Sequence, residues 1–352
     1  MSLADRLTAE ITQGGPISVA RYITACLHDP DFGYYATRPA LGLDGDFVTA
    51  PLISQMFGEL VGVWAASTWE LMGRPAPFRL VEMGPGDGTL MSDILRATRH
   101  APGFIEAADL WLVEVSEPLK ILQRNRLGEA PRWAPALAEV PGGAPLILVA
   151  NELLDCLPAR QFVRTATGWA EQVVGLDARR RLTFGLAATP VASLLPDAAL
   201  GQVYEQSAPQ AALGGEIGRR IATDGGAALL IDYGRAIPGF GDTLQALSRH
   251  EKVDPLANPG KADLTIHADF PAVMRAARAG GAEAAVLTQA DFLARLGIGA
   301  RAEALVRARP DRAATIGRQL HRLVSADEMG ELFKACAIFA PGQTPPGFEE
   351  TT

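Results

Sequence analysis

The chain has 352 residues, 48% of them hydrophobic, and a formal net charge of −8. This composition is typical of a folded enzyme with one elaborated domain or two ordinary ones, and the absence of a dense Lys/Arg block argues against nucleic-acid binding. No hydrophobic run approaches the roughly 20 residues that span a bilayer, so we expect no membrane insertion.

Residues 1–76 are expected to form helical stretches around a glycine-rich loop at 42–51. Pro51 and Ser54 indicate the start of a helix that runs through Trp64. The block at 45–59 has two interpretations, which can both hold. It is a lid whose closure excludes water from a binding site, or a helical cap that packs on a sheet through Phe47, Met56, Phe57 and Trp64.

The most informative motif is LVEMGPGDGTL at residues 80–90. An apolar strand near 78–82 leads into alternating glycines, and a helix is expected at 89–98. Glycine permits positive φ and lets a ligand approach bare backbone, as a cofactor-binding turn between strand and helix requires. The spacing differs from the dinucleotide fingerprint, whose third glycine falls one residue later. The candidate cofactor-binding residues are Glu82, Gly84, Gly86 and Gly88; the alternative is a surface turn.

A second short strand is expected at 110–114, followed by a helix at 117–126. The strand ends in Glu114. In a doubly wound sheet, an acid at this place accepts hydrogen bonds from ribose hydroxyls. The alternative is an exposed carboxylate at a strand end. The glycine turn and the acid together favour a nucleoside ligand.

The apolar run at 146–150 predicts a strand that is buried on both faces. Asn151, Glu152 and Asp155 follow this run and are expected to lie at the carboxyl end of the strand, where open α/β sheets bind ligands. Buried polar groups at this edge would need a partner. Alternatively, Asn151 caps a helix whose first turn contains the two acids, and that helix would still point its N-terminus at the cofactor.

Short alternating segments between 160 and 190 predict antiparallel strands inserted into a parallel α/β pattern. A helix at 213–222 and a strand at 227–232 resume that pattern, and further strands are expected near 264–266 and 283–287. We therefore expect a cap and lid at 1–76 and a main domain at 77–352 with an insertion near 160–225.

The cysteines and histidines predict neither disulfides nor a metal site. Cys26, Cys156 and Cys336 are odd in number and far apart, which indicates reduced thiols and no metal-binding spacing. The five histidines form no pair typical of a zinc site, so we expect no metal. The acid-containing N-terminus is unlike a secretory signal or an arginine-rich presequence, and with the thiols it predicts a cytoplasmic protein.

Taken together, these motifs resemble the MidA-type class I S-adenosylmethionine (SAM) methyltransferases. Mitochondrial relatives in this family are arginine methyltransferases that assist assembly of respiratory complex I. One departure is Leu153-Leu154, where the family commonly has two phenylalanines. The resemblance covers most of the chain, from near residue 16 to near residue 340, and rests on residues 28–35, 45–59, 82–90, 114–116, 151–158, 231–234, 241–244, 260–265 and 288–293.

The resemblance implies a Rossmann-like class I SAM methyltransferase sheet with an N-terminal helical cap and an inserted antiparallel β segment. It implies SAM as cofactor, with Glu82 below the glycine turn, Glu114 on the ribose and Asn151 nearby.

For the acceptor, the resemblance implies a protein arginine, possibly in a complex I subunit or its bacterial equivalent. Glu152 would orient the guanidinium, and Asp155 would support it or accept a proton. Two alternatives stay open: methylation of a small molecule or another residue, and a non-catalytic assembly factor that keeps the fold.

Overall fold

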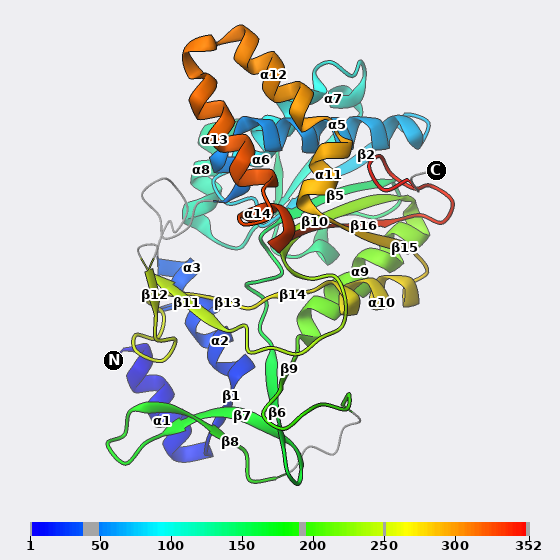
Figure 1. The fold of residues 1–352 in the computed structure, drawn as a ribbon. Coiled ribbons are helices and arrows are strands. Elements are labelled where there is room, and N and C mark those ends of the chain that lie inside the picture. The colour runs from blue at the N-terminus through cyan, green and yellow to red at the C-terminus, as the bar shows by residue number, and fades with distance from the viewer. Residues whose placement is uncertain (1, 38–48, 190–194, 249–250, 350–352) are drawn as a thin grey trace.

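The computed structural model describes residues 2–37, 49–189, 195–248 and 251–349. Figure 1 shows a large sheet with helices on both faces, and below it a smaller part built from antiparallel strands and the N-terminal helices.

The large sheet contains β2 (Phe78–Met83), β3 (Ala108–Val113), β4 (Arg132–Ala134), β5 (Leu146–Asn151), β10 (Gly226–Arg235), β14 (Ala268–Asp269), β15 (Glu283–Thr288) and β16 (Phe333–Phe339). The strand order is β15-β16-β10-β5-β2-β3-β4, and β14 pairs with β10. Strand β16 runs antiparallel to both of its neighbours, whereas the other pairs are parallel. The predicted parallel α/β sheet is confirmed.

Alternate residues of the central strands contribute to two separate hydrophobic clusters. Ile147 and Leu229 belong to one cluster, and their neighbours Leu148 and Leu230 belong to the other. Successive side chains of a strand point to opposite faces of the sheet, so both faces must be covered. This two-sided burial explains why β5 and β10 are continuous apolar runs.

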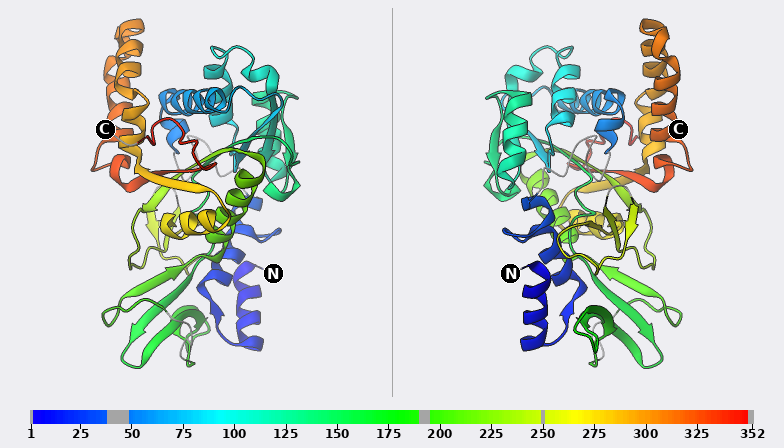
Figure 2. Two further views of the ribbon diagram at one scale, coloured as in Figure 1. Left: turned by 90° about the vertical axis from the view of Figure 1, so that its right-hand side faces the viewer. Right: turned by 90° about the vertical axis from the view of Figure 1, so that its left-hand side faces the viewer.

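Helices cover both faces of the sheet (Figure 2). One cluster includes buried residues of α5 (Gln55–Leu71), α6 (Thr89–Thr98), α7 (Phe104–Ala107), α11 (Gln289–Arg295), α13 (Ala313–Val324) and α14 (Met329–Leu332). The other includes residues of α9 (Ala208–Asp224) and α10 (Phe270–Ala279). Helix α8 (Glu117–Leu127) follows β3, and α12 (Ile298–Ala308) pairs with α13. Within the described ranges, none of the helices combines the length and apolar character needed to cross a membrane.

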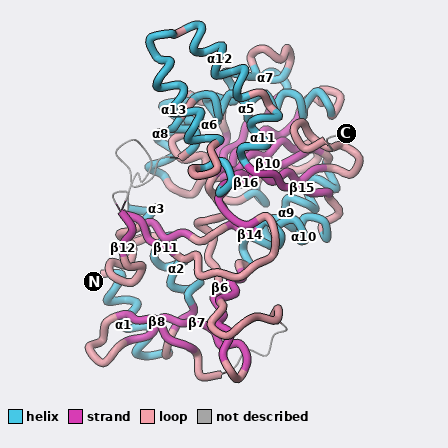
Figure 3. Tube along the Cα trace, in the orientation of Figure 1, coloured by secondary structure: helices cyan, strands magenta, loops and turns pink. Residues whose placement is uncertain are grey.

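The smaller part joins N-terminal residues to the inserted segment (Figure 3). Its helices are α1 (Leu3–Gly14), α2 (Val19–His28) and α3 (Tyr34–Thr37). One antiparallel sheet contains β1 (Ile17–Ser18), β6 (Arg160–Thr165), β7 (Gly168–Leu176), β8 (Leu182–Leu186) and β9 (Val203–Gln206), and a second contains β11 (Gln245–Ser248), β12 (Glu251–Val253) and β13 (Asp263–Thr265). The predicted antiparallel insertion is confirmed.

The first 76 residues contribute to both parts of the molecule. Buried residues of α1 and α2 share a cluster with Val174 of β7 and Leu264 of β13, whereas α5 packs against α6 beside the large sheet. The helix expected through Trp64 is present as α4 (Ala50–Ile53) and α5, separated at Ser54. The division at residue 76 stays a prediction.

The cap interpretation of the 45–59 block agrees with the buried positions of Met56, Phe57 and Trp64. Residues 42–48, including Phe47, lie outside the described residues. The lid therefore stays a prediction.

The order of the strands creates a switch point beside β2. The chain moves from β2 outward through β3 to β4 and then returns to β5 on the other side of β2. In open α/β sheets, ligands bind at the carboxyl ends of the strands at such a point. Met83 pairs with both Val113 and Ala150, so residues 84, 114 and 151 meet at this edge.

Candidate active site

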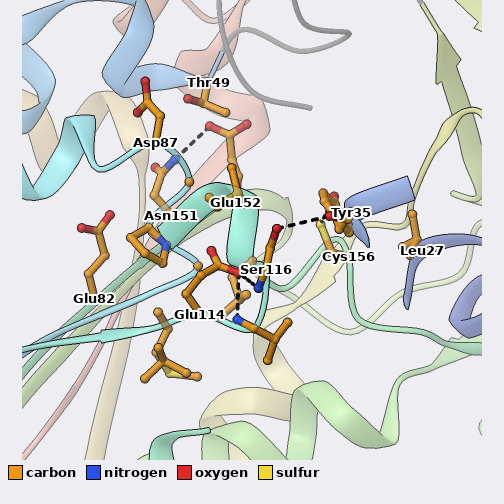
Figure 4. A pocket seen from close by; sticks show the side chains of 18 of the residues that line it. Leu27, Tyr35, Thr49, Glu82, Asp87, Glu114, Ser116, Asn151, Glu152 and Cys156 are labelled. Carbon is orange, nitrogen blue, oxygen red and sulfur yellow. Dashed lines mark hydrogen bonds between the residues drawn. The ribbon is translucent and has the colours of Figure 1, made fainter. Parts of the chain in front are cut away.

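A cavity of about 830 Å³ lies at the carboxyl edge of β2, β3 and β5 (Figure 4). The structure brings seven of the eight candidate residues to its wall: Glu82, Gly84, Gly86, Glu114, Asn151, Glu152 and Asp155. Gly88 is not among the lining residues. It lies behind the turn as the residue that caps α6, where an added Cβ would be 3.4 Å from Leu127 Cδ1 of α8.

The turn after β2 requires glycine at three positions. The φ angles of Gly84, Gly86 and Gly88 are 65°, 55° and 83°, all in the left-handed region. The Gly88 N–H donates to the Pro85 carbonyl at 2.8 Å, which closes the turn. A Cβ at Gly84 would also lie 3.1 Å from Leu153 Cδ1, so the loop after β5 packs against this turn.

Glu114 is only 8% exposed at the end of β3, which contradicts the alternative of an exposed carboxylate. Its Oε1 accepts hydrogen bonds from the backbone N–H groups of Val115 and Ser116, both at 2.8 Å. Its Oε2 accepts from Gln123 Nε2 at 3.3 Å. Burial raises the pKa of Glu114, and these three donors oppose that shift. The carboxylate is thus held in one orientation beside the cavity.

Two buried acceptor atoms at the cavity lack partners among the described residues. They are Glu82 Oε2 and Asn151 Oδ1. Glu82 is 2% exposed, and burial together with the charge of Asp87 raises its pKa to about 8. A buried acceptor without a donor costs free energy, so this wall suits a ligand that brings hydrogen-bond donors.

Glu152 lies on an irregular loop after β5. Residues 152–159, all of them described, contain turns and no helix, which excludes the alternative of a capped helix. The φ angle of Glu152 is 52°, a left-handed conformation that costs a non-glycine residue about 1–3 kcal/mol. Its Oε1 accepts from Asn151 Nδ2 at 2.9 Å and from the Ala50 N–H of α4 at 3.2 Å. Burial and the neighbouring Asp155 raise its pKa to about 7.

Asp155 and Asp232 complete a cluster of three carboxyl groups. Asp232 lies in β10, one residue beyond the pairing of this strand with β5, and accepts from the N–H groups of Leu154 at 2.8 Å and Asp155 at 3.2 Å, which fixes the loop. Burial raises the pKa of Asp155 to about 6, and burial with the charges of Asp155 and Glu152 raises that of Asp232. Among the described residues, no Lys or Arg forms a salt bridge with this cluster. Nor does the described part of the chain hold a group of His, Cys, Asp and Glu suited to a metal ion.

The N-terminal part supplies the opposite wall. The Tyr35 hydroxyl lies 2.8 Å from Cys156 Sγ and donates to Asp263 Oδ1 at 3.1 Å. The Cys156 thiol in turn donates to Asp155 Oδ1 at 3.2 Å. Residues from α3, the loop after β5 and β13 are thus in direct polar contact, and this contact reaches Asp155.

Sequence reasoning assigned no role to Asp232, Gln123 or Tyr35. Asp232 follows the apolar run of β10, and the pattern that identified Glu114 and Asn151 could have identified it too. Gln123 lies in a helix without a motif. Tyr35 belongs to the block at 28–35 that supports the resemblance, but only the fold shows that its side chain reaches the site.

The sequence of residues 60–288 matches the model of a family described as S-adenosyl-L-methionine-dependent methyltransferases. The chain belongs to this methyltransferase family. The resemblance that the motifs indicated is therefore confirmed, as are the Rossmann-like sheet and SAM as the cofactor of this methyltransferase.

Relatives of this methyltransferase span nearly its whole length. The rat "Protein arginine methyltransferase NDUFAF7, mitochondrial" is 35% identical over 98% of this chain and 90% of its own. The Drosophila melanogaster homolog is 36% identical over 97% of this chain and 85% of its own. A crystal structure of a COG1565 superfamily member from Burkholderia thailandensis, bound to S-adenosyl-homocysteine, has a TM-score of 0.85 and 29% identity, and the match covers 99% of this chain and 93% of that one.

The predicted cytoplasmic location is wrong: the curated relatives are named as mitochondrial proteins. Unpaired cysteines such as Cys26 and Cys336 indicate a reducing environment, and that property does not distinguish the cytoplasm from another reducing compartment.

Proposed function

We propose that this methyltransferase transfers the methyl group of SAM to an arginine side chain of a protein, with Glu152 and Asp155 as the catalytic pair. The proposal rests on one observation: Glu152 and Asp155 line the cavity beside the buried Asp232, and no Lys or Arg among the described residues forms a salt bridge with these three carboxyl groups. Relatives named as protein arginine methyltransferases support the same acceptor.

The residues on the β2 and β3 side fit SAM. Glu82 Oε2 and Asn151 Oδ1 are buried acceptors that need donors, and the ammonium group of SAM is a donor. Gly84 and Gly86 expose bare backbone at the wall, and Glu114 presents a fixed carboxylate suited to ribose hydroxyls. When bound, SAM supplies an electrophilic methyl group on a sulfonium.

Glu152 has one oxygen left for the acceptor. Its two hydrogen bonds to described residues both use Oε1, and among these residues Oε2 is left to accept from a guanidinium. An arriving cation lowers the pKa of Glu152 and Asp155 and so favours their ionised forms. Two carboxylates that bind a guanidinium can localise its charge on one nitrogen and leave the other nitrogen to attack the methyl group.

The geometry favours arginine over lysine. The planar guanidinium offers paired N–H donors that match a carboxylate in two parallel hydrogen bonds, whereas an ammonium is a point charge. Asp155 is 4% exposed and lies deeper than Glu152, which suits it to support the bound group or accept a proton. Alignment of acceptor and methyl group in a closed site then supplies much of the rate acceleration.

For the protein substrate we propose a subunit of respiratory complex I or its bacterial equivalent, as the family resemblance implies. The acceptor arginine would enter between the loop at 151–158 and the wall formed by α3 and α4, which both contribute lining residues.

The test is methylation of purified candidate subunits with isotope-labelled SAM, followed by mass spectrometry of the labelled residue. We expect label on one arginine, and its replacement by lysine should abolish labelling. Efficient labelling of the lysine variant would show that Glu152 and Asp155 do not select a guanidinium. SAM binding without turnover on any subunit would favour the non-catalytic alternative.

A further inference from the structure

Gln123 is a fully buried amide on α8, two turns after the loop that carries Glu114. Buried amides need partners for both their donors and their acceptor. Gln123 has them: its Nε2 donates to the Gly86 carbonyl at 2.7 Å and to Glu114 Oε2 at 3.3 Å, and its Oε1 accepts from the Trp133 indole at 2.7 Å.

The Trp133 contact determines which way the amide points. An indole N–H is only a donor, so it must face the amide oxygen. The NH₂ group then points toward two acceptors on different loops, the carbonyl of Gly86 after β2 and the carboxylate of Glu114 after β3. Trp133 itself lies on β4, so one chain of hydrogen bonds joins the loops that follow two strands to a third strand.

We infer that Gln123 is a positioning residue that holds the glycine turn and the ribose-binding acid at the spacing SAM requires. The other oxygen of Glu114 is occupied by the N–H groups of its own loop, so Gln123 is the contact that ties this carboxylate to the turn at Gly86. The inference rests on the proposed roles of Gly86 and Glu114, and it predicts an effect on SAM affinity rather than on the acceptor.

The test replaces Gln123 by methionine, which keeps the side-chain length and removes all three hydrogen bonds. We expect the Kd for SAM, measured by calorimetry, to rise about tenfold, because one of the lost bonds goes to a charged group. The kcat at saturating SAM and the KM for the acceptor should change by less than about twofold, since the acceptor loop makes none of these contacts.

Gln289→Met is the matched control. Gln289 is also fully buried and donates to a backbone carbonyl, that of Leu323, but it is not among the residues that line the cavity. Both variants should lower the Tm, and only Gln123→Met should weaken SAM binding. Equal losses of Tm with no change in SAM affinity for Gln123→Met would overturn the inference.

Trp133→Phe is the second test if Gln123→Met does not fold, because it removes the indole donor, keeps an aromatic ring beside Arg124 and leaves Gln123 in place. The freed amide can then rotate, and we expect the Kd for SAM to rise about threefold. An unchanged Kd would contradict the inference. Glu114→Gln distinguishes a failure of this inference from a failure of the proposed site. If Glu114→Gln leaves SAM affinity unchanged, the proposed role of Glu114 is wrong. If Glu114→Gln weakens SAM binding and Trp133→Phe does not, only the role of Gln123 is wrong.

Discussion

The two halves of the site are built differently. The proposed cofactor half consists mainly of the ends of β2 and β3 and the short loops that follow them, with Glu82 from β2, Glu114 after β3 and Asn151 from the neighbouring β5. The proposed acceptor half is assembled from α3, α4, the β5 loop, β10 and β13, and its central residue Glu152 has a left-handed φ. The first is local in the sequence, and the second depends on contacts between distant segments.

We expect the largest effect from a variant that changes only the proposed cofactor half of the site. Valine at Gly86 would be strained at a φ of 55°, and its branched side chain would lie where the ligand approaches the backbone. We expect Gly86→Val to raise the Kd for SAM roughly 100-fold, measured by calorimetry.

The matched control is Gly201→Val. Gly201 has a similar strain, with a φ of 82°, and an added Cβ there meets nothing within 4 Å. This variant should lose stability without losing SAM affinity. If Gly86→Val binds SAM with the affinity of the wild-type protein, the glycine turn is not part of the SAM site.

Glu152→Gln isolates the acceptor half. The amide keeps the shape of the side chain and loses the charge that binds the guanidinium, so kcat should fall about 100-fold. The Kd for SAM should stay within about twofold, as measured on the same preparation.

Glu216→Gln serves as its control, because Glu216 also lines the cavity but belongs to α9 and not to the carboxyl cluster. Full turnover by Glu152→Gln would show that the acceptor half lies elsewhere.

The different construction of the two halves also explains what the sequence could predict. The glycine turn, Glu114 and the sheet follow from local patterns, since an apolar run ending in a polar residue marks a buried strand and its carboxyl edge. The loop at 152–159 was open to interpretation as a helix, because Asn151 followed by acids is also a helix-start pattern. Tyr35 and Ala50 reach the site only through tertiary packing, which no local pattern records.

The pH dependence should come mainly from the acceptor half. Burial and Asp155 raise the pKa of Glu152 to about 7, so in the unliganded protein the carboxyl is protonated below that pH and ionised above it. Since the ionised form binds the guanidinium, kcat/KM for the acceptor should rise roughly tenfold per pH unit below about 6, reach half its maximum near 7 and level off above about 8. A pH–rate profile checks this. A profile that is flat between pH 5 and 8 would contradict this prediction. So would a Glu152→Gln variant whose kcat/KM rises over the same pH range as that of the wild-type protein.

We expect the smallest effect from a variant that changes a charge near Glu152. The positive charge of Arg322 on α13 lowers the pKa of Glu152, although this is the weakest of the influences on that carboxyl. Arg322→Gln should therefore move the rising limb of the pH profile upward by a few tenths of a pH unit. Arg312→Gln, at the start of the same helix, should leave the limb in place. A downward shift in Arg322→Gln would show that its charge does not act on Glu152.

We propose above all that the carboxyl cluster at the end of β5 directs methyl transfer to a protein arginine. The most direct measurement adds this protein with isotope-labelled SAM to an extract that lacks it and identifies the labelled residues by mass spectrometry. We expect label on an arginine guanidinium with the wild-type protein and none with Glu152→Gln. Label on a lysine, a carboxyl group or a small molecule, or undiminished arginine label with Glu152→Gln, would contradict it.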